Sequence, residues 1–402
     1  MTTRCVLEKG AGQEDMAKRF GIVLGVAAAG VMALGALLPA TAGADDIIWS
    51  RESGTDSIRV GTVLGTGAST LFADGGRPCG IAADPAAGKV YWANWDGGEI
   101  RVASLNGTGT ASTLFPASGG HLCGVAVDPA AGKIYWANFD TNQIRVGNLN
   151  GTGTASTLFA DPAGSAPSGV AIDPANNKIY WTNQFSDEVR AGNLDGSGTA
   201  QTLFSGEDNP IGVTANPAAG KIYWTDLNSG QVRVGPLGGS TVGPAQTLFS
   251  GENSPSGPAI DPTTNKIYWT SFFGGQVRVG PVGGSAVGAA QTLFGNEGAS
   301  LFAALVKAPV NTGRPAISGG AKTLRELSCQ NGTWAPDLLA SFLFRAPTTY
   351  AYQWQVNGSN IPTAIGRTYT PNLAGDYTCT VTAANRAGST SQTSSVKQVK
   401  DK

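Results

Sequence analysis

The stretch Gly124–Asn138, GVAVDPAAGKIYWAN, decides the fold because it recurs along the chain with only small changes. Its Tyr-Trp-Ala-Asn tetrad returns in later copies with Thr in third place and Asn, Asp or Ser in fourth, and a shortened first copy reads Ile48-Trp49-Ser50. The six tryptophans stand 43 to 45 residues apart: Trp49, Trp92, Trp136, Trp181, Trp224 and Trp269. Repeats of this length predict the four-stranded blades of a β-propeller.

Each copy divides into four short strands, which in the third copy are 124–127, 133–136, 143–146 and 156–159. An Asp-Pro pair with a following Gly marks the turn after the first strand, and an Asn-Gly pair marks the hairpin after the third. Large side chains on both faces of the second strand suit a sheet that lies between two other sheets. The segment is therefore expected to be all-β.

The two ends of the repeat region predict how the ring closes. The first copy begins at Asp45 with its second strand, and the last copy ends at Phe294. A spare apolar strand, 301–306, follows it. Placing this strand in the incomplete first blade removes the free sheet edges and predicts six blades.

The repeated tetrad, complete as Tyr223-Trp224-Thr225-Asp226, resembles the YWTD motif of the class B repeats in low-density lipoprotein receptors and their relatives. The resemblance covers residues 45–308 and implies a six-bladed propeller, usually a ligand-binding or scaffold module. The chain departs from the pattern in its first copy, which lacks the Tyr. Only one copy has the final Asp.

Residues 309–402 show a different pattern. After a Pro-rich linker, Trp354 lies between Cys329 and Cys379, and Tyr377 stands two residues before the second cysteine. This spacing is the immunoglobulin signature, in which a disulfide crosses two sheets and a tyrosine marks a corner. We expect an immunoglobulin-like β-sandwich, similar to modules of bacterial surface proteins that act as spacers.

Residues 1–44 resemble an export signal. Lys18 and Arg19 precede the apolar stretch 20–38, and Ala42 and Ala44 form a small-x-small cleavage pattern. Translation could start at Met16, and an uncleaved membrane anchor is the alternative to cleavage. The expected location is extracellular or secreted, with association to the cell envelope left open.

The cysteines support an exported protein. Beyond residue 44 an even number remains, Cys79, Cys123, Cys329 and Cys379, which favours two disulfides. Cys79 and Cys123 occupy equivalent positions in neighbouring copies, so we expect a bond between two blades; free thiols are the alternative.

Few residues suggest catalysis or metal binding. The chain has one histidine, His121, and a formal net charge of -1, which gives no support for a nucleic-acid partner. Four Asp-Pro turns could place a ring of carboxylates that holds Ca²⁺. We favour the simpler alternative that each Asp caps its own turn, and predict no metal or other cofactor. These residues are Asp84, Asp128, Asp173 and Asp261.

Arginines also repeat at one position of the third strand, where a structural pairing with neighbouring blades is the expected role. They are Arg59, Arg101, Arg145, Arg190, Arg233 and Arg278.

Comparison among the copies predicts a binding surface. The turns after the first and third strands are nearly constant, whereas the loops after the second strand and between blades vary. Both variable loops must emerge on one face because successive strands alternate in direction. We call this the variable face, and the opposite one the constant face. The variable face carries the candidate ligand-binding residues Trp95, Asp96, Phe139, Asp140, Phe185, Asp187, Leu227, Phe272 and Phe273. Aromatic residues among acids suit contact with a protein or a glycan, although they could simply seal the blade edges.

The sequence therefore favours a secreted or cell-surface binding or adhesion protein without catalysis, whose partner is a protein or glycan at the cell surface. One alternative is a lyase or lactonase of the propeller type with a metal at the channel mouth; another is a structural envelope component. The charges are unevenly divided, with 14 Lys or Arg against 21 Asp or Glu in 45–308 and 9 against 4 in 309–402. An acidic propeller with a basic C-terminal domain could dock intramolecularly or favour cationic partners, and the division could equally be incidental.

Overall fold

The computed structural model describes residues 45–52, 55–116, 119–282 and 289–402, all within one compact unit, Ala40–Lys402. The predicted signal segment, Met16 and Cys5 lie outside the described residues. No helix within the described ranges is long and apolar enough to span a bilayer.

The chain is all-β, and residues 46–306 form a six-bladed propeller, as predicted. Five blades are four-stranded antiparallel sheets. Blades two and three contain, from the centre outward, β4 (Pro78–Asp84), β5 (Lys89–Asn94), β6 (Ile100–Ser104) and β7 (Ser112–Phe115), then β8 (Leu122–Asp128), β9 (Lys133–Asn138), β10 (Gln143–Asn148) and β11 (Ser156–Ala160). Blade four contains β12 (Pro167–Asp173), β13 (Lys178–Asn183), β14 (Glu188–Asn193) and β15 (Gln201–Ser205). Blades five and six contain β16 (Pro210–Asn216), β17 (Lys221–Asp226), β18 (Gln231–Pro236) and β19 (Gln246–Phe249), then β20 (Pro255–Asp261), β21 (Lys266–Ser271), β22 (Gln276–Pro281) and β23 (Gln291–Phe294).

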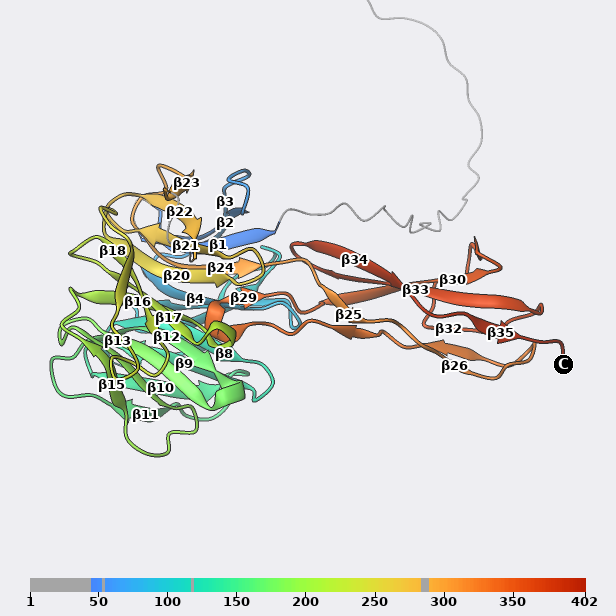
Figure 1. Ribbon diagram of the computed structural model, residues 1–402, viewed down its shortest axis with the longest axis horizontal. Helices are drawn as coiled ribbons and strands as arrows, with labels where there is room; N and C mark the ends of the chain where they lie inside the picture. Colours follow the sequence, from blue (N-terminus) through green and yellow to red (C-terminus); the bar gives the residue numbers. More distant parts are fainter. Residues whose placement is uncertain (1–44, 53–54, 117–118, 283–288) are drawn as a thin grey trace, which may run out of the picture. The chain divides into compact units, whose positions relative to one another are not determined.

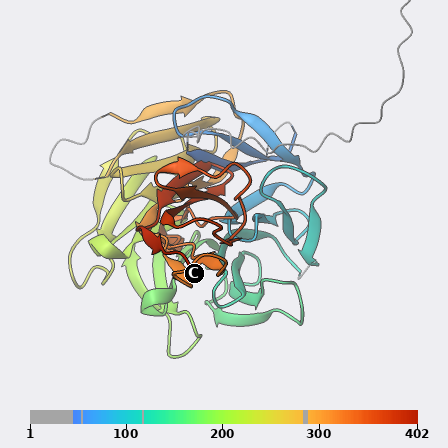
Figure 2. The same ribbon diagram turned by 90° about the vertical axis from the view of Figure 1, so that its right-hand side faces the viewer.

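The first blade closes the ring. Its sheet contains β24 (Ser300–Val306), β1 (Asp46–Arg51), β2 (Ser57–Thr62) and β3 (Ser69–Ala73). The strand predicted at 301–306 pairs antiparallel with β1, and Asp46 lies opposite Val306. The inner strands contact one another in a closed cycle, so the ring has no open blade edge at its centre. Figure 2 shows the blades following one another around this centre in sequence order.

Aromatic stacking joins each blade to the next. All six motif tryptophans are fully buried. Each stacks on a Phe from the outermost strand of the preceding blade, with ring centroids 4.8 to 6.1 Å apart. The pairs are Phe294–Trp49, Phe72–Trp92, Phe115–Trp136, Phe159–Trp181, Phe204–Trp224 and Phe249–Trp269. Because the last blade stacks on the first in the same way, one apolar contact repeats around the ring.

We call each contact between neighbouring blades a joint. Buried ion pairs reinforce most of these joints. An acid that follows the stacking Phe by two or three residues meets the arginine of the next blade, so the arginines have the structural role expected for them. The pairs are Glu297–Arg59, Asp74–Arg101, Asp161–Arg190, Glu207–Arg233 and Glu252–Arg278. In four joints the indole N–H of the stacked tryptophan donates to the same acid.

The joint between blades two and three differs. Phe115 is followed by Pro-Ala-Ser, so no acid stands at the equivalent position. Arg145 instead donates to Gln143 Oε1 and to the carbonyl of Ala155. This joint carries the Cys79–Cys123 disulfide, which links β4 to β8.

Residues 309–402 form short strands in several sheets. They are β25 (Asn311–Gly313), β26 (Ile317–Gly319), β27 (Leu327–Cys329), β28 (Thr333–Trp334), β29 (Leu343–Phe344), β30 (Thr349–Val356), β31 (Ser359–Asn360), β32 (Thr368–Tyr369), β33 (Gly375–Asn385), β34 (Gly388–Thr393) and β35 (Lys397–Val399), with a 3₁₀ turn η3 (Leu339–Ser341). β33 pairs with β30, β34 and β35, and the longest of these strands, β30 and β33, are drawn in red in Figure 1. The disulfide Cys329–Cys379 joins β27 to β33, and Trp354 is fully buried beside it.

Candidate functional site

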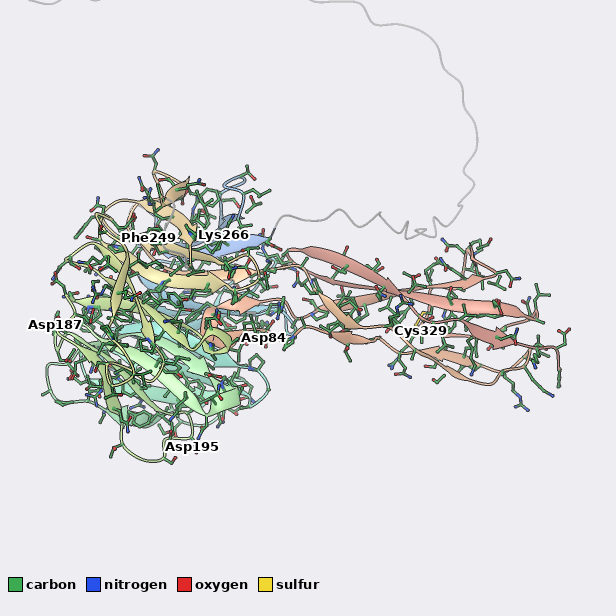
Figure 3. All side chains as sticks on the ribbon, in the orientation of Figure 1. Asp84, Asp187, Asp195, Phe249, Lys266 and Cys329 are labelled. Carbon is green, nitrogen blue, oxygen red and sulfur yellow. A yellow bond between two sulfur atoms is a disulfide. The ribbon has the colours of Figure 1, made fainter. Side chains whose placement is uncertain are left out.

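The propeller's central channel has two different ends. Every inner strand starts at the variable face and ends at an Asp-Pro or Asn-Pro turn, or at Val306 in β24, on the constant face. In Figure 3, Asp187 on a variable loop and Asp84 on a constant turn lie on opposite sides of the propeller.

The constant end is filled by the chain itself. The segment 338–344, which we call the plug, contains η3 and β29, and β29 extends the closure sheet by pairing with β24. Ser341 Oγ donates to the carbonyl of Ala215 at 2.7 Å, and Thr214 Oγ1 donates to the carbonyl of Ala340 at 2.9 Å. Phe342, Leu343 and Phe344 are buried in the propeller core. The sequence analysis did not predict this contact.

Further contacts hold 309–402 to the same end. Thr348 Oγ1 donates to the carbonyl of Pro85, in a constant turn. The Arg386 guanidinium lies 2.9 Å from Asp46, at the start of β1. These contacts place the C-terminal segment on the constant face.

Each of the four Asp-Pro carboxylates accepts hydrogen bonds from groups in or next to its own turn. Asp84 and Asp128 accept from the backbone N–H three residues on, and Asp173 accepts from the Asn176 side chain. Asp261 accepts from Thr263 and Lys307; burial alone would raise the pKa of Asp261, but these hydrogen bonds lower it overall. Across the described ranges, no three His, Cys, Asp or Glu side chains come together as a metal site.

The variable end holds a cavity of about 200 Å³. Two rings of equivalent positions contribute most of its lining. One ring comes from the second residue of the inner strands, and its lining members are Cys79, Cys123, Ser168, Ile211 and Leu301. The other comes from the third residue after each motif tryptophan, and its lining members are Glu52, Trp95, Gln184, Leu227 and Phe272. Arg77 completes the lining. The walls are therefore mainly apolar, and the inter-blade disulfide forms part of them.

The two charged lining residues form an ion pair with each other. Arg77 Nη2 donates to both carboxylate oxygens of Glu52, at 3.1 and 3.0 Å, and Nη1 lies 3.3 Å from Asp96. Burial raises the pKa of Glu52, and the hydrogen bond from Arg77 offsets part of that effect.

Aromatic side chains continue from the cavity across blades two to four. Trp95 stacks on His121 at 4.6 Å and touches Phe139 at 4.9 Å between ring centroids. Phe139 meets Phe185 edge-on at 5.3 Å, and Phe185 is 62% exposed. His121 Nδ1 lies 2.8 Å from Asp140. We call the continuous row of Trp95, His121, Phe139 and Phe185 the aromatic strip; Phe185 is exposed and the other three are half-buried.

The other predicted residues have different surroundings. Leu227 and Phe272 line the cavity, and Phe273 packs edge-on against Phe272 while remaining 73% exposed. Asp96 contacts Arg77, as described above. Asp187 accepts from the backbone N–H of Asn209, which gives this carboxylate a structural bond between two variable loops.

Sequence reasoning missed part of the lining: Glu52, Arg77, Gln184 and the inner-strand residues. Gln184 occupies the same repeat position as Trp95, but aromatic Phe185 next to it was chosen instead. Counting three residues from each motif tryptophan would have found both Glu52 and Gln184.

Comparisons with known proteins show the fold. No family model and no curated protein matches the chain. A chain in the crystal structure of a nidogen/laminin complex is 19% identical, with a TM-score of 0.56, over 65% of this chain and 98% of that one. TolB from Acinetobacter baumannii is 14% identical, with a TM-score of 0.51, over 65% of this chain and 66% of its own. A streptogramin B lyase is 15% identical over 86% of this chain and 97% of its own, with a TM-score of 0.42.

Proposed function

We propose that the chain is a secreted or cell-surface binding protein without catalytic activity, and that its variable face recognises a protein or a glycan. The observation that carries this proposal is the contrast between the channel ends. The plug fills the constant end, while the variable end presents a cavity beside the aromatic strip. Aromatic side chains next to a cavity are typical anchors of a binding interface.

The comparisons support recognition of a protein in a limited way. A chain of the same fold belongs to a nidogen/laminin complex, so a propeller of this kind is compatible with a protein partner. The two disulfides fit an oxidising compartment outside the cytoplasm. The YWTD-type relationship and the export signal that the sequence predicts would be consistent with such a compartment.

We also propose that residues 309–402 are an immunoglobulin-like module. The disulfide joins two sheets beside buried Trp354, and the Tyr377 hydroxyl donates to the Leu373 carbonyl four residues upstream. These are the features of an immunoglobulin core and its tyrosine corner. Because its contacts are on the constant face, this module leaves the variable face free for a partner.

An enzyme of the lyase or lactonase type remains the alternative in another class. It needs an acid or base, or a metal, at the channel mouth. The charged residues that line the cavity, Glu52 and Arg77, are bonded to each other, and the remaining lining is mainly apolar. A structural envelope role without a ligand is the second alternative, and it predicts no saturable binding.

The test is a pull-down of cell-surface and secreted fractions with the purified protein. A variant with Trp95, Phe139, Phe185 and Phe272 all changed to Ala removes the aromatic contacts. A matched control changes Leu64 and Val242 to Ala, since these exposed apolar residues lie on hairpins of the constant face.

Retention of a partner by the wild type and the control, with loss by the folded aromatic variant, would support the proposal. Equal recovery by all three proteins would refute the variable face as the site. Absence of saturable binding would favour the structural role.

A further inference from the structure

The size of the cavity at the variable end limits what it can hold. Its volume is about 200 Å³. Pockets that enclose a whole small-molecule ligand usually measure about 300 to 1,000 Å³. A cavity below this range suits one side chain of a larger partner.

The lining selects an apolar side chain. Trp95, Leu227 and Phe272 stand around the mouth, and Ile211 and Leu301 belong to the buried starts of the inner strands. The charged pair of Glu52 and Arg77 is already bonded internally. A polar group in this cavity would lose its hydrogen bonds to water without gaining new ones, whereas an apolar group has no hydrogen bonds to lose.

The surroundings of the cavity are acidic. The variable loops carry two cations, Arg51 and Arg77, and Arg77 is bonded to Glu52 and Asp96. Apart from the acids that pair with the repeated arginines, six carboxylates of these loops are exposed or half-buried: Glu52, Asp56, Asp96, Asp140, Asp187 and Asp208. Such an excess attracts a positive charge held just outside the cavity. The ring of Phe185, which is 62% exposed, adds a further favourable site for a cation.

We propose that the cavity takes one apolar side chain from a partner protein in which a lysine or arginine stands next to that side chain. This inference rests on the proposed function and names the chemistry of its partner. The apolar group fills the cavity, and the neighbouring cation reaches the carboxylates and aromatic faces at the rim. A glycan lacks this combination of an apolar side chain and a neighbouring cation. Binding of a glycan in the cavity would therefore contradict the proposal.

The test selects random heptapeptides displayed on phage against the purified protein. Selected peptides are then measured by fluorescence polarisation against wild type and three variants. Leu227→Trp fills the cavity with a residue that the equivalent position of blade two already accepts as Trp95. Glu52→Gln with Asp96→Asn removes two rim charges, and Gln184 shows that Gln is accepted at the first position. Asp195→Asn is the charge control, because Asp195 is exposed on a hairpin of the constant face.

The selected peptides are expected to carry an apolar residue beside Lys or Arg. Affinity should fall about tenfold or more with Leu227→Trp, as for loss of an anchoring side chain, and should stay unchanged with Asp195→Asn. The double charge variant should weaken binding of the cationic peptides more than binding of their neutral analogues.

Two results would overturn the inference in different ways. Peptides that need the open cavity but lack a cation would contradict the proposed chemistry while leaving the variable face as a binding site. Failure to select any peptide, or selection of peptides that bind Leu227→Trp equally well, would also overturn it. The pull-down would then decide the proposed function by itself.

Discussion

Two joints of the ring use different chemistry for the same task. Between blades five and six, Glu252 accepts from Trp269 Nε1 at 3.1 Å and from Arg278 Nε at 3.0 Å. Between blades two and three, the acid is missing and a disulfide links the inner strands instead. The Phe–Trp stacking is present in both. The comparison indicates that stacking alone defines the joint, and that a second interaction, ionic or covalent, reinforces it.

Removing the disulfide should produce the largest effect on this comparison. Cys79→Ser with Cys123→Ser introduces the residue that two other copies have at this position, Ser168 and Ser256. Because the bond spans 44 residues, its loss should lower the free energy of unfolding by about 4 kcal/mol in the chain-entropy view. Urea unfolding followed by tryptophan fluorescence measures this. A change below about 1 kcal/mol would show that the bond does not reinforce the joint.

Restoring the missing acid between blades two and three should recover part of the free energy of unfolding that is lost with the disulfide. Asp74 and Asp161 stand two residues after their stacking Phe in the sequence, and Ala117→Asp introduces an acid at the same sequence separation from Phe115. Trp136 Nε1 has no hydrogen-bond partner among the described residues, and Arg145 has no carboxylate there. In the Cys→Ser background we expect a gain of about 1 to 2 kcal/mol, from hydrogen bonds to a charged group.

The same unfolding measurement on Ala117→Asn separates charge from polarity. If the Asn variant gains as much free energy of unfolding as the Asp variant, the charge of the acid does not reinforce the joint.

The joint between blades four and five presents the opposite case, with one acid too many. Arg233 lies 3.2 Å from Glu207 and 3.8 Å from Asp226. Burial, and then the charge of Glu207, raise the pKa of Asp226 to about 8. The folded protein therefore retains a proton that the unfolded chain releases above its ordinary pKa of 3.8, and stability should fall as pH rises from about 4 to about 8.

Asp226→Asn should remove this pH dependence. Three other copies already have Asn at the position, Asn94, Asn138 and Asn183. We expect the variant to be more stable than wild type at pH 8 by about 1 kcal/mol or more, with the difference shrinking toward pH 5. Thermal unfolding at both pH values measures it, and parallel pH profiles for the two proteins would contradict the assignment.

The repeats made most of the propeller predictable, because a period of about 44 residues and a spare apolar strand leave few ways to close a ring. The strand predicted at 301–306 begins one residue earlier, at Ser300. The joint acids were harder to find because they follow the stacking Phe by two residues in some blades and three in others. The plug had a signal that was overlooked: Leu338–Phe344 reads LLASFLF, an apolar run that belongs to neither module's strand pattern.

The candidate site was predictable only in part. Alternating loop directions place the variable residues on one face, but which of them meet at the channel mouth depends on a fixed offset from the motif tryptophan. At that offset the copies hold Glu, Trp, Phe, Gln, Leu and Phe, a mixture without a recognisable pattern. Only the closed ring shows that five of these six residues, all but Phe139, line one cavity.

The closure sheet also determines the order in which the strand pairs of the propeller can form. Asp46 and Val306 pair although they stand 260 residues apart, and β29 joins the same sheet later still. Contacts so distant in sequence form late, since the intervening chain loses much freedom when its ends meet. The edge of β1 that faces β24 is therefore completed late, although β1 pairs early with β2, and this open edge is available to other chains meanwhile. Chains cut before Ser300 should for this reason associate through β1 rather than settle into a smaller ring.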